Sequence, residues 1–349
     1  MKVDGKVLSQ FFRFIVMRDR PSVSFLIPTL NAGGILENCL QSIRRQDYPT
    51  DRVEIVVADG GSSDGTRDIA RHYGAVVLDN PRRGYDTGKC VALAAAHGDY
   101  IVFVDADNEL AHPDFLTLAI QAFEKYPQAL GLESYYLPST KMSSFCVYLS
   151  HLLHISDPIA WMMSVKPVPL AREGGVERWT FPGSSLAWPM GANGFVFRRA
   201  DLSHLTADDK FEDCAVVVEM ARQGRKEWLR VTNQGVHHYV VSGLMDFMKK
   251  RRRQTFHFLS LRGEGASSWT QMKPDVPSWL ACLYCVSIVG PLYHVLVGLV
   301  KTRHPAWLWH PIACGVSVIG VAWGVLTYLR TGRNQDVEAQ LQPRQRLKE

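Results

Sequence analysis

The stretch "YIVFVDADNEL", from Tyr100 to Leu110, joins the pattern of a buried strand to an acidic end. Tyr100 to Val104 is apolar, aromatic and β-branched, which is typical of a strand in the interior of a sheet. Two acids one residue apart, Asp105 and Asp107, follow without a spacer. Because burying an unpaired carboxylate is costly, we expect these acids at the carboxyl end of the strand, facing water or a cation.

The chain before this stretch alternates between strand-like and helix-like segments. The hydrophobic patterns predict strands at 22–28, 53–58 and 75–78, and helices at 34–46, 66–73 and 87–96. This alternation predicts an α/β fold in which a mostly parallel, Rossmann-like sheet carries helices on both faces. Ligands of such sheets bind beyond the carboxyl ends of the strands.

Polar residues follow three of the four predicted strands. The first strand ends in "PTLNAGG" (28–34), the second in "DGGSSDGT" (59–66), and the fourth in the acids already described. Each segment alone could be a turn before a helix, with Ser63 or Asp64 as the helix cap in the second. Three such segments at one edge of a sheet instead predict a binding site.

The chemistry of this edge suits a nucleotide. Asp59 can accept hydrogen bonds from a base or a ribose, and Asp105 with Asp107 can hold one Mg²⁺ or Mn²⁺ against two phosphates. The sequence contains neither the phosphate-loop pattern nor the dinucleotide fingerprint. A bound metal would therefore have to neutralise a diphosphate and act as a Lewis acid on the leaving group.

Three segments, "VSFLIPTLN" (23–31), "VEIVVADGGSSDGT" (53–66) and "GDYIVFVDADNEL" (98–110), resemble in order and spacing the nucleotide-binding half of family 2 glycosyltransferases of the GT-A fold. The resemblance implies that Asp59 contacts the nucleotide base and that Asp105 and Asp107 bind the ribose and the metal. Gly60 stands where many relatives have a second acid. The residues expected to bind the donor are Pro28, Thr29, Asn31, Asp59, Gly60, Lys89, Asp105, Ala106 and Asp107.

Two later segments resemble the acceptor side of the same family. "MGANGFVFRRADL" (190–202) predicts acceptor contacts at Gly191, Ala192 and Asn193. "FEDCAVVVEMARQG" (211–224) resembles the acidic pair that opens a helix, which implies catalytic roles for Glu212 and Asp213. The family places its general base at the second acid, so Asp213 is the expected base for a hydroxyl acceptor. Acids are also stabilised at any helix N-terminus, which is the alternative explanation.

A histidine pair and a basic cluster follow. His237 or His238 matches by position a histidine that GT-A enzymes often use as a further metal or diphosphate ligand, and imidazole suits Mn²⁺ better than Mg²⁺. The cluster 249–253, "KKRRR", could lie in a lipid headgroup layer. Arg251 and Arg253 are expected to hold an acceptor or donor phosphate; a solvated face is the alternative.

Two apolar runs near the C-terminus, 276–300 and 305–329, each have about 25 residues without Asp, Glu, Lys or Arg. Each is long enough for a hydrocarbon core of roughly 30 Å. They predict a hairpin of two transmembrane helices joined by 301–304, with a re-entrant hairpin as the alternative. More basic residues flank the outer ends of the runs than lie in the loop, which favours a cytosolic catalytic domain.

The sequence thus predicts an ordered set of domains. An amphipathic helix at 1–20 would lie in the membrane interface or pack on the protein itself. A GT-A catalytic domain at 21–240 would have a nucleotide-binding half at 21–110 and an acceptor half at 111–240, in which residues 139–183 form an interfacial helix pair or a core insertion. A basic interfacial segment at 241–272, two transmembrane helices at 273–330 and a cytosolic tail at 331–349 follow.

Composition excludes some classes of function. The net charge of +5 is mild and concentrated in few places, which argues against nucleic acid as a partner. Seven cysteines without framework spacing argue against a disulfide-stapled secreted protein. Cys282 and Cys285 lie within an apolar run without a second pair, so we interpret them as packing residues and not as a zinc or redox site.

The function predicted from these features is that of a metal-dependent, inverting glycosyltransferase at the cytosolic face of a membrane. It would pass a sugar from a nucleotide-diphosphate donor to a polyprenyl phosphate or a polyprenyl-linked glycan. The alternatives are a catalytically silent, membrane-anchored nucleotide-sugar-binding scaffold and a processive enzyme similar to polysaccharide synthases. The Q-x-x-R-W motif of processive enzymes is absent after Gln254, and a sugar nucleotidyltransferase would need a basic loop where "PTLNAGG" stands.

Overall fold

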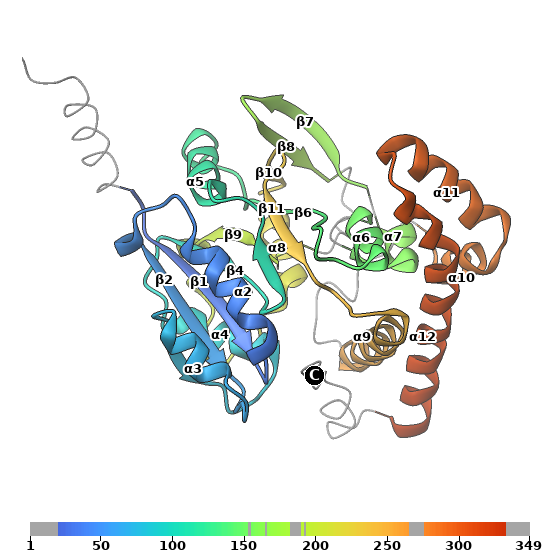
Figure 1. Cartoon of the computed structure of the whole chain (residues 1–349), viewed down its shortest axis with the longest axis horizontal. Helices are drawn as coiled ribbons and strands as arrows, with labels where there is room; N and C mark the ends of the chain where they lie inside the picture. Colours follow the sequence, from blue (N-terminus) through green and yellow to red (C-terminus); the bar gives the residue numbers. More distant parts are fainter. Residues whose placement is uncertain are drawn as a thin grey trace, which may run out of the picture.

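The computed structural model describes residues 20–152, 155–164, 166–181, 190–191, 193–264 and 276–332 (Figure 1). Three predictions therefore lie outside the described residues: the N-terminal helix up to residue 19, the acceptor contact at Ala192, and the tail after residue 332.

A five-stranded sheet forms the centre of the nucleotide-binding half. Its order is β3-β2-β1-β4-β9. The four strands β1 (Val23–Thr29), β2 (Val53–Asp59), β3 (Val76–Asp79) and β4 (Tyr100–Phe103) are parallel, and β9 (Phe195–Arg198) is antiparallel at one edge. The predicted α/β fold is confirmed, and all four predicted strands are present within two residues at either end.

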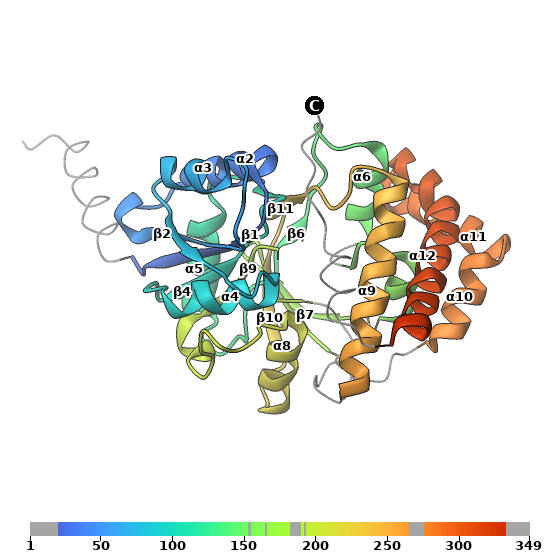
Figure 2. The ribbon, with the colours of Figure 1, turned by 90° about the horizontal axis from the view of Figure 1, so that it is seen from below.

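Helices cover both faces of this sheet (Figure 2). Phe25 and Ile27 of β1 pack in the same core as α2 (Gly33–Arg44), α3 (Thr66–His72) and α5 (Phe115–Lys125). Leu26, one residue out of phase, packs on the opposite face with α4 (Tyr85–Ala94) and α8 (Asp213–Arg222). Alternate residues of one buried strand thus build two separate cores, because successive side chains of a strand point to opposite faces.

Two small sheets complete the acceptor half. One joins β5 (Asn108–Leu110), β11 (Gly235–His238) and β6 (Tyr135–Tyr136), and the other joins β10 (Glu227–Val231), β8 (Val176–Thr180) and β7 (Val168–Glu173). Short 3-10 helices lie at η1 (Thr50–Arg52) and η3 (Arg199–Leu202). The first sheet matters for the site, because it brings the histidine pair of β11 beside the segment that follows Asp107.

A helical region lies beside the α/β domain (Figures 1 and 2). It contains α9 (Leu244–Glu264), α10 (Ser278–Val286), α11 (Val289–Thr302), η5 (Pro305–Trp309) and α12 (His310–Thr331). Segment 139–183, which the sequence left ambiguous, supplies α6 (Ser144–His151) and α7 (Pro158–Met163) to this region, and β7 and β8 to the small sheet. The α6 side chains pack with η5, so α6 belongs to the core of the helical region.

The predicted pair of transmembrane helices is found only in part. One stretch of the described residues, Pro305–Thr331, is long and apolar enough to cross a membrane. The first apolar run is instead split into α10 and α11, which are bent by 82° relative to each other. Multi-pass topology is therefore not supported.

The break has a local cause. Ser287 leaves the helical conformation after α10, and its hydroxyl accepts a hydrogen bond from the backbone N–H of Gly290. Pro291 has no N–H with which to continue the helical hydrogen bonds toward Ser287. Local backbone chemistry thus overrides the apolar composition that predicted one straight helix.

Helix α12 packs closely along α9. Gly320 and Gly324 of α12 face the backbone of α9: a Cβ atom at Gly324 would lie 2.6 Å from the carbonyl oxygen of Arg252. Arg252 donates to Thr327 at 3.1 Å and lies over the ring of Trp323. The small residues of α12 therefore let the basic helix α9 pack closely against the middle and C-terminal turns of α12.

Candidate active site

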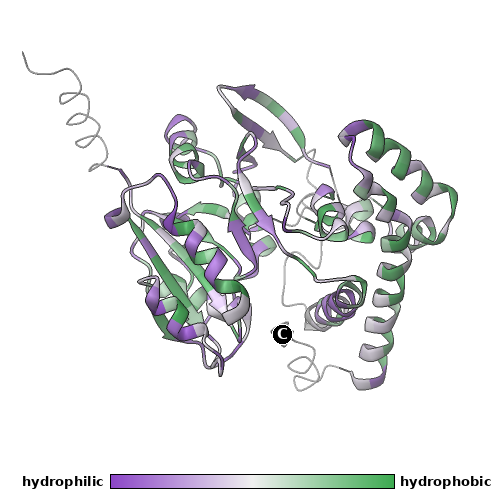
Figure 3. Cartoon of the chain, in the orientation of Figure 1, coloured by the Kyte–Doolittle hydropathy of each residue, from purple (hydrophilic) through white to green (hydrophobic). Residues whose placement is uncertain are grey.

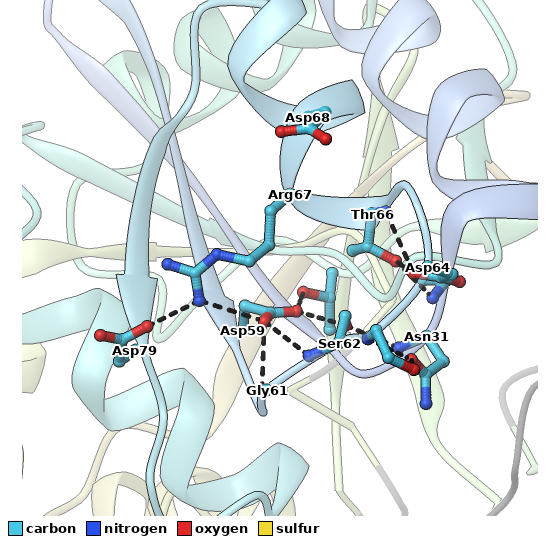
Figure 4. Close-up of polar contacts among 12 residues, drawn as sticks. Asn31, Asp59, Gly61, Ser62, Asp64, Thr66, Arg67, Asp68 and Asp79 are labelled. Carbon is cyan, nitrogen blue, oxygen red and sulfur yellow. Dashed lines mark hydrogen bonds and ion pairs between the residues drawn. The ribbon is translucent and has the colours of Figure 1, made fainter.

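Asp59 lies at the carboxyl end of β2 and is enclosed by protein donors (Figure 4). One carboxylate oxygen accepts from the hydroxyls of Thr29 and Ser62, at 3.1 and 2.5 Å. The other accepts from the backbone N–H groups of Gly61 and Ser62 and from Arg67. Burial raises the pKa of Asp59, but these hydrogen bonds outweigh it and the net pKa is lowered. In this structure the carboxylate of Asp59 fixes the conformation of the loop that follows it. The predicted contact of Asp59 with a nucleotide base stays a prediction.

The first two polar loops are tied to each other. The side chain of Asn31 accepts from the backbone N–H of Ser63 at 2.9 Å, and the N–H of Asn31 donates to Ser62 at 2.7 Å. Asp64 accepts from the backbone N–H groups of Gly33 and Thr66, at the starts of α2 and α3. The N-cap residues of α2 and α3 are Ala32 and Gly65, so the alternative explanation of Asp64 as a helix cap is not confirmed. These contacts instead fix the shape of the sheet edge.

Asp105 and Asp107 follow β4 at the same edge. Asn108 positions both, because its side chain accepts from the N–H of Asp105 at 3.2 Å and donates to the carboxylate of Asp107 at 3.1 Å. His238 of β11 places Nε2 at 3.6 Å from the other oxygen of Asp107. The neighbouring residue His237 instead contacts the carbonyl of Leu137 through Nδ1 at 2.9 Å. Of the two histidines, only His238 lies at the acidic pair.

These residues suit a divalent cation whose coordination shell is completed by a bound ligand. Two carboxylates and one imidazole form a donor set suited to Mn²⁺. The imidazole of His238 turns Nε2 toward Asp107, while its Nδ1 atom is buried without a hydrogen-bond partner. Among the described residues, no group of three or more His, Cys, Asp and Glu side chains is already assembled around one point. A cation at Asp105 and Asp107 would thus depend on phosphate oxygens or water for the rest of its shell.

The predicted base, Asp213, opens α8 and forms an ion pair with Lys89 of α4. The Nζ and Oδ1 atoms are 2.7 Å apart, and the exposed fractions of the two side chains are 1% and 21%. The ammonium of Lys89 lies within 6 Å of the ring centroids of Tyr85, Phe103 and Phe211. Lys89 was expected to bind the donor; in this structure its contact is with the expected base.

The titration of this pair reflects the surrounding acids. Burial raises the pKa of Asp213 above its usual value, and the nearby carboxylates of Asp105 and Asp86 raise it further, although Lys89 opposes both. Burial alone would lower the pKa of Lys89, but the carboxylates of Asp213 and Asp105 outweigh it and raise that pKa. The carboxylates around the pair thus favour the protonated forms of both Asp213 and Lys89.

The segment expected to bind the acceptor lies directly against Asp213. Gly191 has a positive φ of 110°, and a Cβ atom there would lie 2.7 Å from the carbonyl oxygen of Asp213. Asn193 donates to the hydroxyl of Tyr136 at 2.5 Å, while its own Oδ1 atom is buried without a partner. The carboxylates of Asp105 and Asp107 help to raise the pKa of Tyr136, although burial is the larger cause. Tyr136 is therefore a site residue that the sequence did not reveal.

The basic cluster of α9 is divided between two faces of the helix. Arg251 forms an ion pair with Asp157 of the helical region at 3.0 Å and is largely buried, and its predicted contact with an acceptor or donor phosphate stays a prediction. Lys250 and Arg253 face the α/β domain. The positive charge of Lys250 lowers the pKa of Asp107, and that of Arg253 lowers the pKa of Tyr85. Burial lowers the pKa of Lys250 itself to about 8.

A cavity opens between the α/β domain and α9 beside Asp213. Its lining includes Tyr85, Asp86, Phe211, Glu212 and, from α9, His257. Lys250, Arg253 and His257 recur at intervals of three and four residues, the spacing of one helical face. The sequence showed this spacing, but only the packing of α9 against the domain shows which face meets the site.

Comparisons with known proteins agree with the resemblance seen in the sequence. Residues 24–137 match the family model described as "Glycosyl transferase family 2". The chain is 29% identical over 93 residues to glycosyltransferase AglE of Haloferax volcanii, which covers 25% of this chain and 31% of AglE. It is 30% identical over 118 residues to the GalNAc(5)-diNAcBac-PP-undecaprenol beta-1,3-glucosyltransferase of Campylobacter jejuni, which covers 32% of this chain and 38% of that enzyme.

These two matches span about a third of the length of the curated relatives. The match to the family model covers the part of the chain that holds Asp59, Asp105 and Asp107. Among solved structures, the chain resembles the mannosyltransferase PcManGT from Pyrobaculum calidifontis in complex with GDP-Man and Mn²⁺, with a TM-score of 0.49 and 18% identity over 90% of this chain and 94% of that one. The family match and the mixed sheet together support the GT-A fold expected from the sequence.

Proposed function

We propose that this chain, whose residues 24–137 match family 2 glycosyltransferases, is a metal-dependent, inverting glycosyltransferase. It takes a sugar from a nucleotide-diphosphate donor and passes it to an acceptor held at the cytosolic face of a membrane, either a polyprenyl phosphate or a polyprenyl-linked glycan. The observation that carries the proposal is the meeting of two chemical groups at one sheet edge. The Asp105, Asp107 and His238 set lies beside the Lys89–Asp213 pair, whose pKa values respond to Asp105.

The donor lies across the carboxyl ends of β1, β2 and β4. Thr29, Asn31 and the loop held by Asp59 form the nucleotide side, and the glycine after Asp59 lets the ligand approach the backbone. Asp105, Asp107 and His238 would hold the divalent cation, which when bound would supply charge that stabilises the diphosphate leaving group. Lys250 of α9, whose positive charge lowers the pKa of Asp107, adds positive charge near the acidic pair.

The acceptor approaches from the side of Gly191 and Asn193, next to Asp213. Asp213 receives the proton of a hydroxyl acceptor as its oxygen attacks the anomeric carbon. A single displacement inverts the configuration at that carbon, and the chain itself forms no covalent bond to the sugar. Glu212 lines the same cavity and helps to orient the acceptor.

Membrane attachment uses the apolar surface of α10, α11 and α12 (Figure 3). Ile288, Val289 and Val300 are each more than three-quarters exposed, and Leu329 nearly so, which is costly in water. Because Arg252 lies against Trp323 and Thr327, the C-terminal half of α12 meets charged groups on one side. We therefore favour helices that enter the membrane from the cytosolic side without a full hairpin of two spans.

A binding scaffold without activity is the main alternative. The acids expected for donor binding and catalysis are all present: Asp59, Asp105, Asp107, Glu212 and Asp213. A processive synthase is disfavoured by the absence of the Q-x-x-R-W motif.

A screen of nucleotide-sugars separates these functions. The thermal unfolding of the protein in detergent is measured with UDP- and GDP-sugars, with and without Mn²⁺. Release of the nucleoside diphosphate is measured on separate samples of the folded protein. An enzyme is stabilised by at least one donor in the presence of Mn²⁺ and slowly releases its diphosphate. Stabilisation without any release would identify a scaffold, and stabilisation by no donor would contradict both functions.

A further inference from the structure

The start of the apolar stretch Pro305–Thr331 is tied to the candidate active site through α6. The indole N–H of Trp309 donates to the hydroxyl of Ser144 at 3.0 Å. Two residues further along α6, the thiol of Cys146 donates to the carbonyl of His238 at 3.5 Å. One short helix thus connects the residue before α12 with the histidine that lies at the acidic pair.

The middle and the end of α12 are tied to the same domain through α7 and α9, and α9 lies between α12 and the α/β domain (Figures 1 and 2). In the middle of α12, Ser317 donates to the buried carboxylate of Asp157 in α7. Toward its C-terminus, the ring centroid of Tyr328 lies 5.9 Å from that of Phe256 in α9. The next residue of α9, His257, lines the cavity of the candidate active site.

A helix that crosses a membrane could not make these contacts at both of its ends. The hydrocarbon core is about 30 Å thick, so a crossing helix separates the groups at its two ends by about that depth. If α12 crossed, the part of α9 that packs on Gly320 and Gly324 would enter the hydrocarbon, together with the exposed ammonium of Lys249. An unpaired charge in hydrocarbon is costly. The contacts of α12 therefore argue against a crossing that its composition alone would allow.

An apolar surface lies on the side of the helical region that is turned away from the α/β domain (Figures 2 and 3). On α11, exposed apolar side chains recur at intervals of three and four residues, the spacing of one helical face. The exposed apolar residues that form this surface include Val289, Tyr293, Leu296 and Val300 of α11 and Trp279 and Leu283 of α10. With 14 residues, α11 is about 21 Å long and too short to cross a membrane. This surface suits insertion into a single leaflet.

The charges of this region suit anionic lipids. Residues 276–332 contain no Asp or Glu. The exposed cations Lys301 and Arg303 follow the apolar face of α11, and Trp and Tyr are the side chains most often found between hydrocarbon and headgroups. A second copy of this chain on the same surface would bring these cations toward one another, whereas lipid phosphates bring the opposite charge.

We propose that the helical region binds the surface of an anionic membrane within one leaflet, with the exposed face of α11 inserted and with α12 lying along the membrane and not across it. This inference rests on the membrane attachment in the proposed function and specifies its lipid partner and its topology. Both flanks of α12 then lie on the same side of the membrane as the α/β domain. The transfer reaction itself is not needed for either statement.

Labelling with a membrane-impermeant maleimide tests the topology. Arg303→Cys and Arg330→Cys flank α12, and Asp68→Cys marks the α/β domain, where the Asp68 side chain is 87% exposed. Sealed vesicles with the cytosolic face outward are prepared from cells that express each full-length variant, and the unsubstituted protein gives the background of its seven cysteines. We expect all three variants to be labelled to a similar extent before detergent is added. If α12 crosses, one of the two flanking variants is labelled only after detergent is added.

Flotation with lipid vesicles tests the partner. The affinity of the purified protein is compared for vesicles of phosphatidylcholine alone and for vesicles with added phosphatidylglycerol. We expect about tenfold tighter binding to the anionic vesicles, and Lys301→Gln combined with Arg303→Gln should remove most of this preference. Val289→Asp combined with Leu296→Asp should weaken binding at least about tenfold. Val76→Asp, at a 52% exposed valine of β3, is the control and should bind like the wild type.

Each contrary outcome counts against a specific statement. Protection of Arg303→Cys or Arg330→Cys before detergent would overturn the position of α12 along the membrane. Equal binding to both kinds of vesicle, or unchanged binding after Val289→Asp and Leu296→Asp, would overturn the anionic lipid surface as the partner. Diphosphate release from nucleotide-sugars is measured separately, so a failure of the proposed reaction is distinguishable from a failure of this inference.

Discussion

Replacement of Lys89 by Met should destabilise the protein and change how its stability depends on pH. Met keeps most of the volume of the Lys89 stem among Tyr85, Phe103 and Phe211 but removes the charge that pairs with Asp213. Removing one partner of a buried ion pair typically costs about 3–5 kcal/mol. Because Asp213 keeps 21% of its side chain exposed, we expect the lower end, about 3 kcal/mol.

This loss corresponds to a measurable change in Tm. With 349 residues and an unfolding entropy of about 2.1 cal/mol/K per residue, a loss of about 3 kcal/mol lowers the Tm by about 4 °C. Lys125→Met is a matched control, because the Lys125–Glu173 pair at 3.2 Å is 44% and 70% exposed. Exposed ion pairs contribute little to stability, so this control should shift the Tm by roughly 1 °C or less.

The pH dependence follows from the pKa of Asp213. A carboxyl whose pKa is raised on folding favours the folded state below its unfolded pKa, and this contribution is lost as the pH rises through the folded pKa. Lys89 opposes the raised pKa of Asp213, so its removal raises that pKa further. Lys89→Met should therefore be more destabilised at pH 8 than at pH 5, and the acid limb of its activity profile should move to higher pH. A Tm within 1 °C of the wild type, or an equal loss at both pH values, would refute the assigned pairing.

Two further predictions concern α9. Gly324→Leu should push α9 away from α12 and cost about 1–3 kcal/mol of stability, because its Cβ would meet the backbone of α9; Gly315→Leu, with no atom within 4 Å, is the control in the same thermal unfolding assay. Arg251→Gln should lower the Tm by leaving the buried Asp157 without its ion pair, whereas Arg253→Gln should raise the KM for the donor about tenfold with little change in Tm. The reverse pattern would show that the faces of α9 are assigned incorrectly.

The parallel sheet was predictable because its signals are local. Each strand is a short apolar run that ends in Gly, Asn or Asp, and each helix shows a period near 3.6. The acids Asp105 and Asp107 follow closely after β4, with only Val104 between the strand and Asp105, so the position of the strand fixed their position too. Pairing in a parallel sheet then brought Asp59 to the same edge.

What the sequence could not predict depends on tertiary packing. The alternation of side chains along β11 implies that His237 and His238 point in opposite directions, but the partner strands β5 and β6 decide which one meets Asp107. Tyr136 carries no motif and reaches the site only because β6 pairs with β11. Lys89 showed no sequence signal for its contact with Asp213, which is 124 residues away along the chain.

The sequence of the helical region contains local signals of its structure that its apolar composition does not indicate. The apolar run 276–300 contains "SIVGP" (287–291), and its Pro could have indicated the break between α10 and α11. The small residues Ser317, Gly320 and Gly324 recur along one face of α12, a spacing typical of close helix contacts. Hydropathy averaged over each apolar run does not reveal either feature.

Manganese binding by the acids after β4 is the most direct test of the central claim. The affinity for Mn²⁺ is measured by electron paramagnetic resonance, with UDP or GDP present, for the wild type, for Asp107→Ala and for Asp51→Ala. Asp51 precedes β2 at the opposite end of the sheet and serves as the control. We expect the wild type and Asp51→Ala to bind Mn²⁺ with the nucleotide, and Asp107→Ala to bind it at least about tenfold more weakly. Equal Mn²⁺ affinity in Asp107→Ala and the wild type would contradict the account.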